Sequence, residues 1–187
     1  ESRRLTDLVQ EIINLSRLQG NDPLHSAYAV DVEDIIREAA NQCQINAESR
    51  NIEIVFGEIS NSTVLGDRDQ LIMAAHNLID NAINYSPEST KISVSASVVD
   101  EVVEISVADQ GIGIGENELE RIFERFYRID PARSRETGGT GLGLSIVKHV
   151  AINHGGDVKV WSKINVGSTF ALRLPIAPEE SIEDVEN

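Results

Sequence analysis

Apolar side chains recur every three or four residues in four stretches of the chain, a spacing that predicts helices. The stretches are residues 2–19, 31–49, 67–84 and 144–154, and Asp31 is expected to cap the second of them. In 2–19 the apolar stripe is broad for so short a helix. It favours half of a helical hairpin that pairs with a second helix or subunit, although packing on its own domain is the alternative.

Alternating apolar and polar side chains predict strands elsewhere in the chain. The predicted strands are 52–56, 63–65, 92–98, 103–107, 158–160 and 170–174. Two of them, 92–98 and 103–107, form an antiparallel hairpin, and a second hairpin turns at 165–167. A short helix near 116–123 precedes the last helix. Helices on one face of a largely antiparallel sheet predict an α/β (α+β) two-layer sandwich.

The charge balance limits the possible partners. The chain has 187 residues and a formal net charge of −15, and this argues against general nucleic-acid binding. Part of the charge lies in residues 177–187, which lack a basic side chain and are expected to be disordered. The rest is acidic too, so an acidic body that binds a nucleotide would need Mg²⁺ and a few well-placed arginines.

Cys43 is the only cysteine, which excludes an internal disulfide and a thiolate metal cluster. No apolar run approaches the roughly 18 residues that a membrane span requires. Because Glu1 falls within a helical pattern and is not a methionine, we expect a piece of a longer protein.

Four glycines fall within residues 138–143, directly before the last predicted helix. Glycine lets the backbone approach a ligand closely, and a helix N-terminus favours an anion such as phosphate. By itself such a cluster is more often an ordinary flexible loop.

Three asparagines, Asn77, Asn81 and Asn84, fall within about 60° of one another on helix 67–84, opposite its apolar face. Asparagine is a mediocre helix former, and a solvated face would usually carry Lys or Glu. The stripe therefore indicates either a solvated face or amide oxygens that meet a hard cation or phosphate.

Asp109-Gln-Gly111-Ile-Gly113 follows the end of a predicted strand. A carboxylate only accepts hydrogen bonds, so Asp109 can receive an exocyclic amine such as that of adenine. The glycines let a flat ring come near the backbone. A simple turn is the alternative, while a calcium loop is excluded because its further acidic ligands are missing.

These segments together resemble the sequence boxes of sensor histidine kinases. Residues 77–87 resemble the N box, 109–113 the G1 box, 123–128 the F box and 139–144 the G2 box, and 167–170 is similar to the last strand of that family. The boxes occur in the order and at the spacing of that family. The sequence is most similar in character to membrane-bound two-component sensors of the PhoR-like kind.

The resemblance implies a Bergerat (GHKL) ATP-binding fold in residues 21–176. It also implies that residues 1–20 are the end of the second helix of a dimerisation and phosphoacceptor hairpin, and that 177–187 are an acidic tail. Asn77, Asn81 and Arg128 would be the catalytic residues. Asn81 would supply an oxygen to Mg²⁺, and Arg128 would meet the terminal phosphates of ATP.

The remaining site residues also follow from the resemblance. Asp109 would take the adenine amine with help from Thr169, while Tyr85 would border the base. Gly111 and Gly113 would give the base room. The backbone of the glycine-rich segment would cradle the phosphates: Gly139, Thr140, Gly141, Leu142 and Gly143. The segment from about Arg128 to Thr140 is expected to be mobile when no nucleotide is bound.

One position departs from the family, because many relatives carry a basic residue where this chain has Asn84. A phosphate contact would then be lost, unless Lys91, Arg133 or Arg135 replaces it. The two arginines can equally be solvated charges.

Three functions are open: a kinase, an ATP hydrolase and a passive nucleotide binder. Related clamp ATPases such as gyrase carry a glutamate base where this chain has Asn77, and an amide cannot accept a proton at neutral pH. The intact boxes count against a passive binder. The resemblance therefore implies a protein-histidine kinase that supplies a response regulator. The parent would be a homodimer anchored in a membrane, with this domain in the cytoplasm and away from the lipid.

The acceptor histidine is expected to lie outside the chain. None of the four histidines, His25, His76, His149 and His154, has the His-Glu/Asp…Thr-Pro context of a phosphoacceptor. For His154, which precedes two glycines, a helix-capping role is expected.

Overall fold

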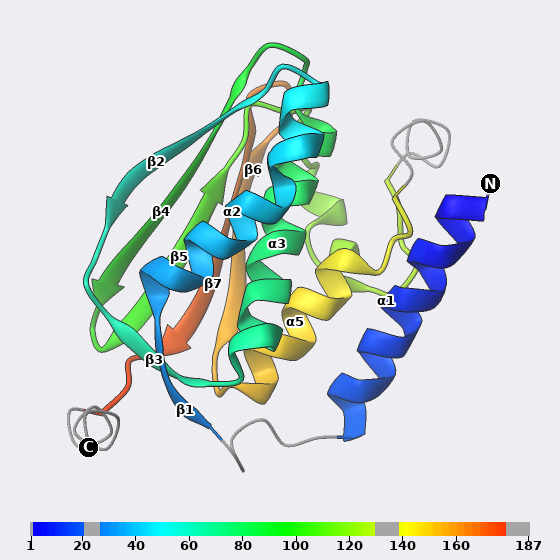
Figure 1. The fold of residues 1–187 in the computed structure, drawn as a ribbon. Helices are drawn as coiled ribbons and strands as arrows, with labels where there is room; N and C mark the ends of the chain where they lie inside the picture. The colour runs from blue at the N-terminus through cyan, green and yellow to red at the C-terminus, as the bar shows by residue number, and fades with distance from the viewer. Residues whose placement is uncertain (1, 21–26, 130–138, 179–187) are drawn as a thin grey trace.

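The computed structural model describes residues 2–20, 27–129 and 139–178, and Figure 1 shows their arrangement. A five-stranded sheet has the order β2-β4-β5-β7-β6, and three helices cover one of its faces. Its strands are β2 (Glu53–Ile59), β4 (Lys91–Val99), β5 (Val102–Ala108), β6 (Asp157–Lys163) and β7 (Gly167–Pro175). Only β2 and β4 pair in parallel among these neighbours. The predicted two-layer sandwich is therefore confirmed.

The hairpin of β4 and β5 shows how the sequence sets the register. Asp100 and Glu101 both have positive φ, of 50° and 61°, which is the backbone of a two-residue turn that matches strand twist. Val98 then pairs with Val103, and the alternating side chains Ile92, Val94 and Ala96 are buried beneath the helices.

The covering helices are α2 (Val32–Ser49), α3 (Arg68–Tyr85) and α5 (Gly143–Asn153). Their apolar faces pack on the sheet, as the spacing predicts, and the predicted cap is confirmed. Asp31 accepts hydrogen bonds from the backbone N–H of Glu33 at 2.7 Å and of Asp34 at 3.3 Å.

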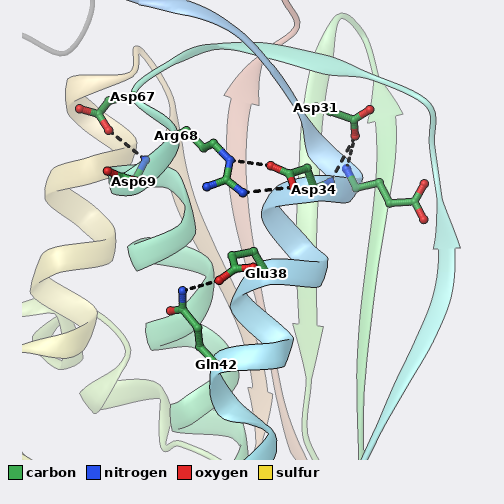
Figure 2. A network of polar contacts seen from close by, with 8 residues as sticks. Asp31, Asp34, Glu38, Gln42, Asp67, Arg68 and Asp69 are labelled. Atoms are coloured by element: carbon green, nitrogen blue, oxygen red, sulfur yellow. Dashed lines mark hydrogen bonds and ion pairs between the residues drawn. The ribbon is translucent and has the colours of Figure 1, made fainter.

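Figure 2 shows how the N-terminal ends of α2 and α3 are joined. Asp67 caps α3, and Arg68 Nε lies 2.7 Å from Asp34 Oδ2. The hydrogen bond from Arg68 lowers the pKa of the Asp34 carboxyl below its usual range. Both side chains are partly exposed to solvent, so we expect the pair to add little to stability.

A small second sheet lies at the end of the domain. β1 (Tyr28–Asp31) pairs antiparallel with β3 (Thr63–Gly66). The backbone N–H of Ala177 donates to Thr63 O at 2.8 Å, and Ala177 is buried. The fold therefore continues through a residue that the sequence assigns to the acidic tail; 179–187 lie outside the described residues.

α1 (Ser2–Gly20) lies beside α5. Leu15 and Leu18 are buried, and Asn153 Nδ2 donates to Leu18 O at 2.9 Å. The helix thus packs on its own domain through one edge of its apolar stripe. Other apolar side chains of α1 are exposed: Leu5, Val9, Ile12 and Ile13. Pairing with a further helix stays a prediction.

Two details differ from the predicted elements. The short helix predicted near 116–123 is a pair of 3₁₀ turns, η2 (Glu116–Glu118) and η3 (Arg121–Phe123). The last helix begins at Gly143 and ends at Asn153. In the described ranges, no helix is both long and apolar enough to cross a bilayer.

Candidate functional site

Two adjoining cavities lie beside α3, where the glycine-rich segments approach it. One has Asp109 in its wall, and the other has Asn77 and Gly139. They form one continuous cleft, because six residues line both: Asn81, Tyr85, Ile122, Tyr127, Arg128 and Leu144. The segments that the sequence singles out are thus brought together, although about 50 residues of sequence separate the asparagine stripe from the glycine cluster at 138–143.

Asp109 stands directly after β5, at the apolar end of the cleft. Its Oδ1 accepts the backbone N–H of Gly111 at 2.8 Å and that of Ser168 at 3.1 Å. Burial raises the pKa of the Asp109 carboxyl, and these two N–H donors partly oppose that shift. Across the described part of the chain, Oδ2 has no hydrogen-bond partner, so it remains available to a ligand that donates.

The two glycines after Asp109 have different roles. A Cβ atom on Gly111 would lie 2.6 Å from Tyr85 O and 2.8 Å from Asp109 Oδ1. Gly113 has φ +71°, and its Cβ would lie 2.1 Å from Lys163 O. Gly113 lines the cleft. Gly111 instead lets the loop pack against the end of α3, behind the carboxylate.

Ser168 and Phe170, and not Thr169, are the β7 residues that line this end of the cleft. Ser168 lines the cavity with Phe170 and hydrogen-bonds Asp109 through its backbone. Thr169 pairs with Trp161 across the sheet, and alternation along β7 directs its side chain to the opposite face. The predicted placement of Thr169 is therefore wrong by one residue.

Apolar side chains complete this end, and motif reasoning assigned them no role. They come from the loop after Gly113, from η3 and from β7: Ile114, Ile122 and Phe170. Phe170 is supported by an edge-to-face contact with Phe123, at a centroid distance of 6.5 Å. The alternation of side chains along β7 was a signal that could have placed Ser168 and Phe170 on the same face, in the cleft.

The other end of the cleft is rich in amides. Asn77 Nδ2 donates to Met73 O at 2.8 Å, and a Cβ on Gly143 would lie 2.8 Å from Asn77 Oδ1. This bond orients the Asn77 side chain with its oxygen toward Gly143. Asn81, one turn later, lines both cavities and so lies where they meet.

Asn84 belongs to a polar triad between α2 and α3. Asn84 Nδ2 donates to Asp80 Oδ2 at 2.8 Å, while Asn46 Nδ2 donates to Asp80 Oδ1 at 2.7 Å and reaches Asn84 Oδ1 at 3.2 Å. Asn84 still lines the cleft. Lys91 does not replace a basic residue here, because it pairs with Glu53 at 2.7 Å and lines neither cavity. Arg133 and Arg135 lie outside the described residues.

The glycine-rich segment closes the amide end. Gly139, Thr140, Gly141 and Gly143 line the cleft, whereas Leu142 is fully buried beneath them. The N–H of Leu142 is already used, because it donates to Thr140 Oγ1 at 3.2 Å. Most of the segment expected to be mobile, residues 130–138, lies outside the described residues.

Gly141 fixes this segment against the loop that leads to Arg128. Its φ is +78°, and a Cβ there would lie 3.0 Å from Phe126 Cα. Phe126 N–H donates to Gly141 O at 2.9 Å. Arg128, two residues later, lines both cavities and supplies a cation at their junction.

Two carboxylates at the amide end were missed by sequence reasoning. One is Asp80, which follows Asn77 on α3, and the other is Glu11 on α1. The hydroxyl of Thr140, from the glycine-rich segment, donates a hydrogen bond to Glu11 Oε2. No local motif marks Glu11, because its contact spans 129 residues of sequence.

The described histidines lie outside the cleft. The predicted capping role of His154 is confirmed: it ends α5, its Nδ1 lies 2.8 Å from Val150 O, and Asp67 N–H donates to its Nε2 at 3.1 Å. Burial lowers the pKa of His154. His149 contacts Arg125, and His25 lies outside the described residues.

The donor set suits a magnesium-bound nucleotide. Amide and carboxylate oxygens are the ligands that Mg²⁺ prefers, and it usually takes one or two from protein, with water and phosphate completing the shell. Among the described residues, no three His, Cys, Asp or Glu side chains group as a metal site.

Comparison with known proteins identifies this arrangement. Residues 66–178 match the family described as "Histidine kinase-, DNA gyrase B-, and HSP90-like ATPase". The chain belongs to this family. The matched range includes α3, Asp109 and the glycines that follow it, the glycine cluster at 138–143 and β7, and thus most of the cleft wall.

Its relatives include sensor kinases. The chain is 49% identical over 179 residues to the Sensor-like histidine kinase SenX3 of Mycolicibacterium smegmatis, covering 96% of this chain and 47% of that protein. It is 34% identical over 183 residues to the Phosphate regulon sensor protein PhoR of Pseudomonas aeruginosa, covering 98% and 41%. The chain thus spans about half the length of these relatives or less.

Solved structures give the same result. The full-length ShkA crystal structure in complex with AMPPNP has a TM-score of 0.79 at 31% identity, over 92% of this chain and 36% of that one. A mycobacterial sensor histidine kinase, MprB, has a TM-score of 0.70 at 30% identity, over 81% and 99%. The fold is the ATP-binding domain of sensor histidine kinases, as the motifs predict.

Proposed function

We propose that this domain binds Mg·ATP and donates the γ-phosphoryl group to a histidine on a helical hairpin of the same parent protein. That histidine would then supply an aspartate of a response regulator. One observation carries the proposal: a single cleft has a partly buried carboxylate with a free oxygen at its apolar end and Asn81 with Arg128 at its polar end.

The apolar end suits adenine. Ile114, Ile122 and Phe170 offer apolar surface to a flat ring, and Asp109 Oδ2 accepts from an exocyclic amine. Guanine carries a carbonyl oxygen at the corresponding ring position, which would face a carboxylate without a proton between them. The cleft should therefore prefer adenine nucleotides.

The polar end suits the phosphates. Asn81 would hold Mg²⁺ with Asn77 nearby, and the cation would neutralise phosphate charge. Arg128 would neutralise more of it, while the backbone at Gly139, Thr140, Gly141 and Gly143 lies along the cleft wall. Phosphoryl transfer depends mainly on positioning and charge stabilisation, which these groups supply.

Hydrolysis is the weaker candidate. A base for water is missing at Asn77, whose amide is bound to Met73 O. Two carboxylates do line this end, but each already accepts from the protein: Asp80 from Asn46 and Asn84, and Glu11 from Thr140. The described histidines lie away from the cleft, which favours an acceptor elsewhere in the parent protein.

The remaining features of the parent are proposals that rest on the sensor kinases to which the chain is similar. They are a homodimer, a phosphoacceptor hairpin of which α1 is the end, a response-regulator partner, and a membrane anchor with this domain in the cytoplasm.

Calorimetric titration with ATP, ADP and GTP, each with and without Mg²⁺, tests the proposal directly. We expect binding of the adenine nucleotides, with Mg²⁺ strengthening ATP, and no comparable binding of GTP. Equal affinity for GTP and ATP would contradict the role of Asp109.

A further inference from the structure

Tyr127 is an aromatic side chain of the cleft to which the motifs assign no role. It is partly buried, and it lines both cavities. With the base at the Asp109 end and the terminal phosphates at the Asn77 end, the sugar and the first phosphate of a nucleotide would lie beside this junction. The orientation of the Tyr127 ring therefore affects the part of the ligand that all adenine nucleotides share.

A cation stacks on this ring from outside the cleft. The guanidinium carbon of Arg121 lies 4.3 Å from the centroid of the Tyr127 ring, a distance at which a cation is attracted to an aromatic face. Arg121 is exposed and lines neither cavity, so it contacts the ring and not the ligand site. Within residues 2–20, 27–129 and 139–178, its guanidinium makes no hydrogen bond or ion pair, so the stacking contact is what holds it there.

The backbone between the two residues folds back and returns the ring to the cation. Glu124 N–H donates to Arg121 O at 2.9 Å, and Tyr127 N–H donates to Glu124 O at 3.3 Å. Phe126 has a φ of 63°, in the left-handed region, and its N–H donates to Gly141 O at 2.9 Å. These bonds fix the main chain and leave the Tyr127 side chain to be held by the cation.

We infer that Arg121 is a positioning residue whose guanidinium holds the Tyr127 ring at the junction of the two cavities, in the orientation that accepts a nucleotide. The inference rests on the proposed function and adds to it a residue that lies outside the cleft. A ring that is already ordered loses less freedom when the ligand binds, so the contact strengthens binding without touching the ligand. Because the ring lies beside the shared part of the ligand, ATP and ADP benefit equally.

Arg121→Met removes the cation and keeps an unbranched side chain. We expect the affinities for Mg·ATP and for ADP to fall by the same factor, about two- to fivefold in calorimetric titrations. Arg121→Lys should recover part of this loss, since an ammonium also stacks on a ring, although without the planar fit of a guanidinium. Recovery of this kind would not follow from a loss of packing alone.

Arg125→Met is the matched control. Arg125 is exposed in the same loop, lines neither cavity and contacts His149 instead of an aromatic ring. The control removes the same charge four residues away, and at about 0.15 M salt it should leave both affinities unchanged because exposed charges are screened. Urea unfolding of both variants should give similar free energies of unfolding, which separates binding from stability.

A double-mutant cycle shows whether Arg121 acts through the ring. Tyr127→Leu removes the aromatic face, and in this background Arg121→Met should cause no further loss of ADP affinity. Tyr127→Phe keeps the face, so the effect of Arg121→Met should persist there.

Four results would overturn the inference. Unchanged affinities in Arg121→Met would show that the contact is irrelevant to binding, and a loss for ATP well above that for ADP would show that Arg121 acts as a charge on the terminal phosphate. An equal effect with and without the Tyr127 ring would exclude action through the ring. A matching loss in Arg125→Met would assign the effect to net charge. If wild type binds no adenine nucleotide, the proposed function itself fails, which is a different outcome.

Discussion

Asp109→Asn is the most informative single change, because it alters one oxygen and leaves the rest of the local structure in place. The amide oxygen of the variant side chain would still accept from Gly111 and Ser168, as Oδ1 of Asp109 does at 2.8 and 3.1 Å. The second oxygen becomes an NH₂ group that faces the cleft. An acceptor for the adenine amine is thereby replaced by a donor.

The size of the effect follows from the bond that is lost. A hydrogen bond to a charged group contributes about 1.5–3 kcal/mol, which corresponds to roughly 10- to 150-fold in Kd. The new NH₂ group of the variant would also face the adenine amine, and the repulsion between these two donors can only add to the loss of affinity. We therefore expect ATP and ADP to weaken at least tenfold, and the preference for ATP over GTP to shrink.

Stability should move in the opposite direction. Burial raises the folded-state pKa of Asp109 above its unfolded value, so its ionised form is disfavoured in the fold. The contribution of this group to stability is present below the unfolded pKa, about 4, and is lost as pH rises through the folded pKa. At pH 7 the variant should be as stable as wild type or more so, and near pH 3 this gain should vanish.

Calorimetry with Mg·ATP, ADP and GTP measures the first effect, and urea unfolding at both pH values measures the second. Asn84→Ala is the control, because Asn84 lines the cleft but is engaged with Asp80 and Asn46. It should weaken ATP far less than Asp109→Asn. Equal losses in the two variants, or an Asp109→Asn protein that fails to fold, would refute the assignment of Asp109 to the base.

Three further predictions concern transfer, backbone and pH. Incubation with γ-labelled ATP should leave no stable label on this chain, and a labelled band would contradict the absence of the acceptor. Gly113→Ala should lower the free energy of unfolding by about 2 kcal/mol or more in urea titrations, because φ is +71° and the added Cβ would lie 2.1 Å from Lys163 O. Burial lowers the pKa of His154, so its stabilising contribution should be complete above the unfolded pKa of about 6.5 and lost as pH falls through the folded value. Unfolding at pH 7.5 and 5.5 should show this loss in wild type and less of it in His154→Asn; an identical pH dependence would exclude the histidine as its source.

Most secondary structure could be predicted because its signals are local. Periodicity located the helices and strands, Asp31 marked a helix start, and Asn77, Asn81 and Asn84 were placed on one helical face. All of these depend on residues a few positions apart, where backbone geometry alone fixes which side chains share a face.

The errors arose where a role depends on a distant partner. The last strand was predicted, yet Thr169 was placed in the cleft instead of Ser168, because a one-residue shift in register moves every side chain to the other face. The loss of a phosphate contact at Asn84 stays a prediction, whereas its bonds to Asp80 and Asn46 were not foreseen because they depend on how α2 packs on α3.

The sequence by itself determined the elements, the order of the motifs and the family to which they belong, since these follow from spacing along one chain. Only the tertiary structure decided which groups meet: Asp109 with Ser168, and Glu11 with Thr140, across 59 and 129 residues. Such contacts form when helices and strands pack, and the burial and charge they create have no counterpart in any local pattern of residues.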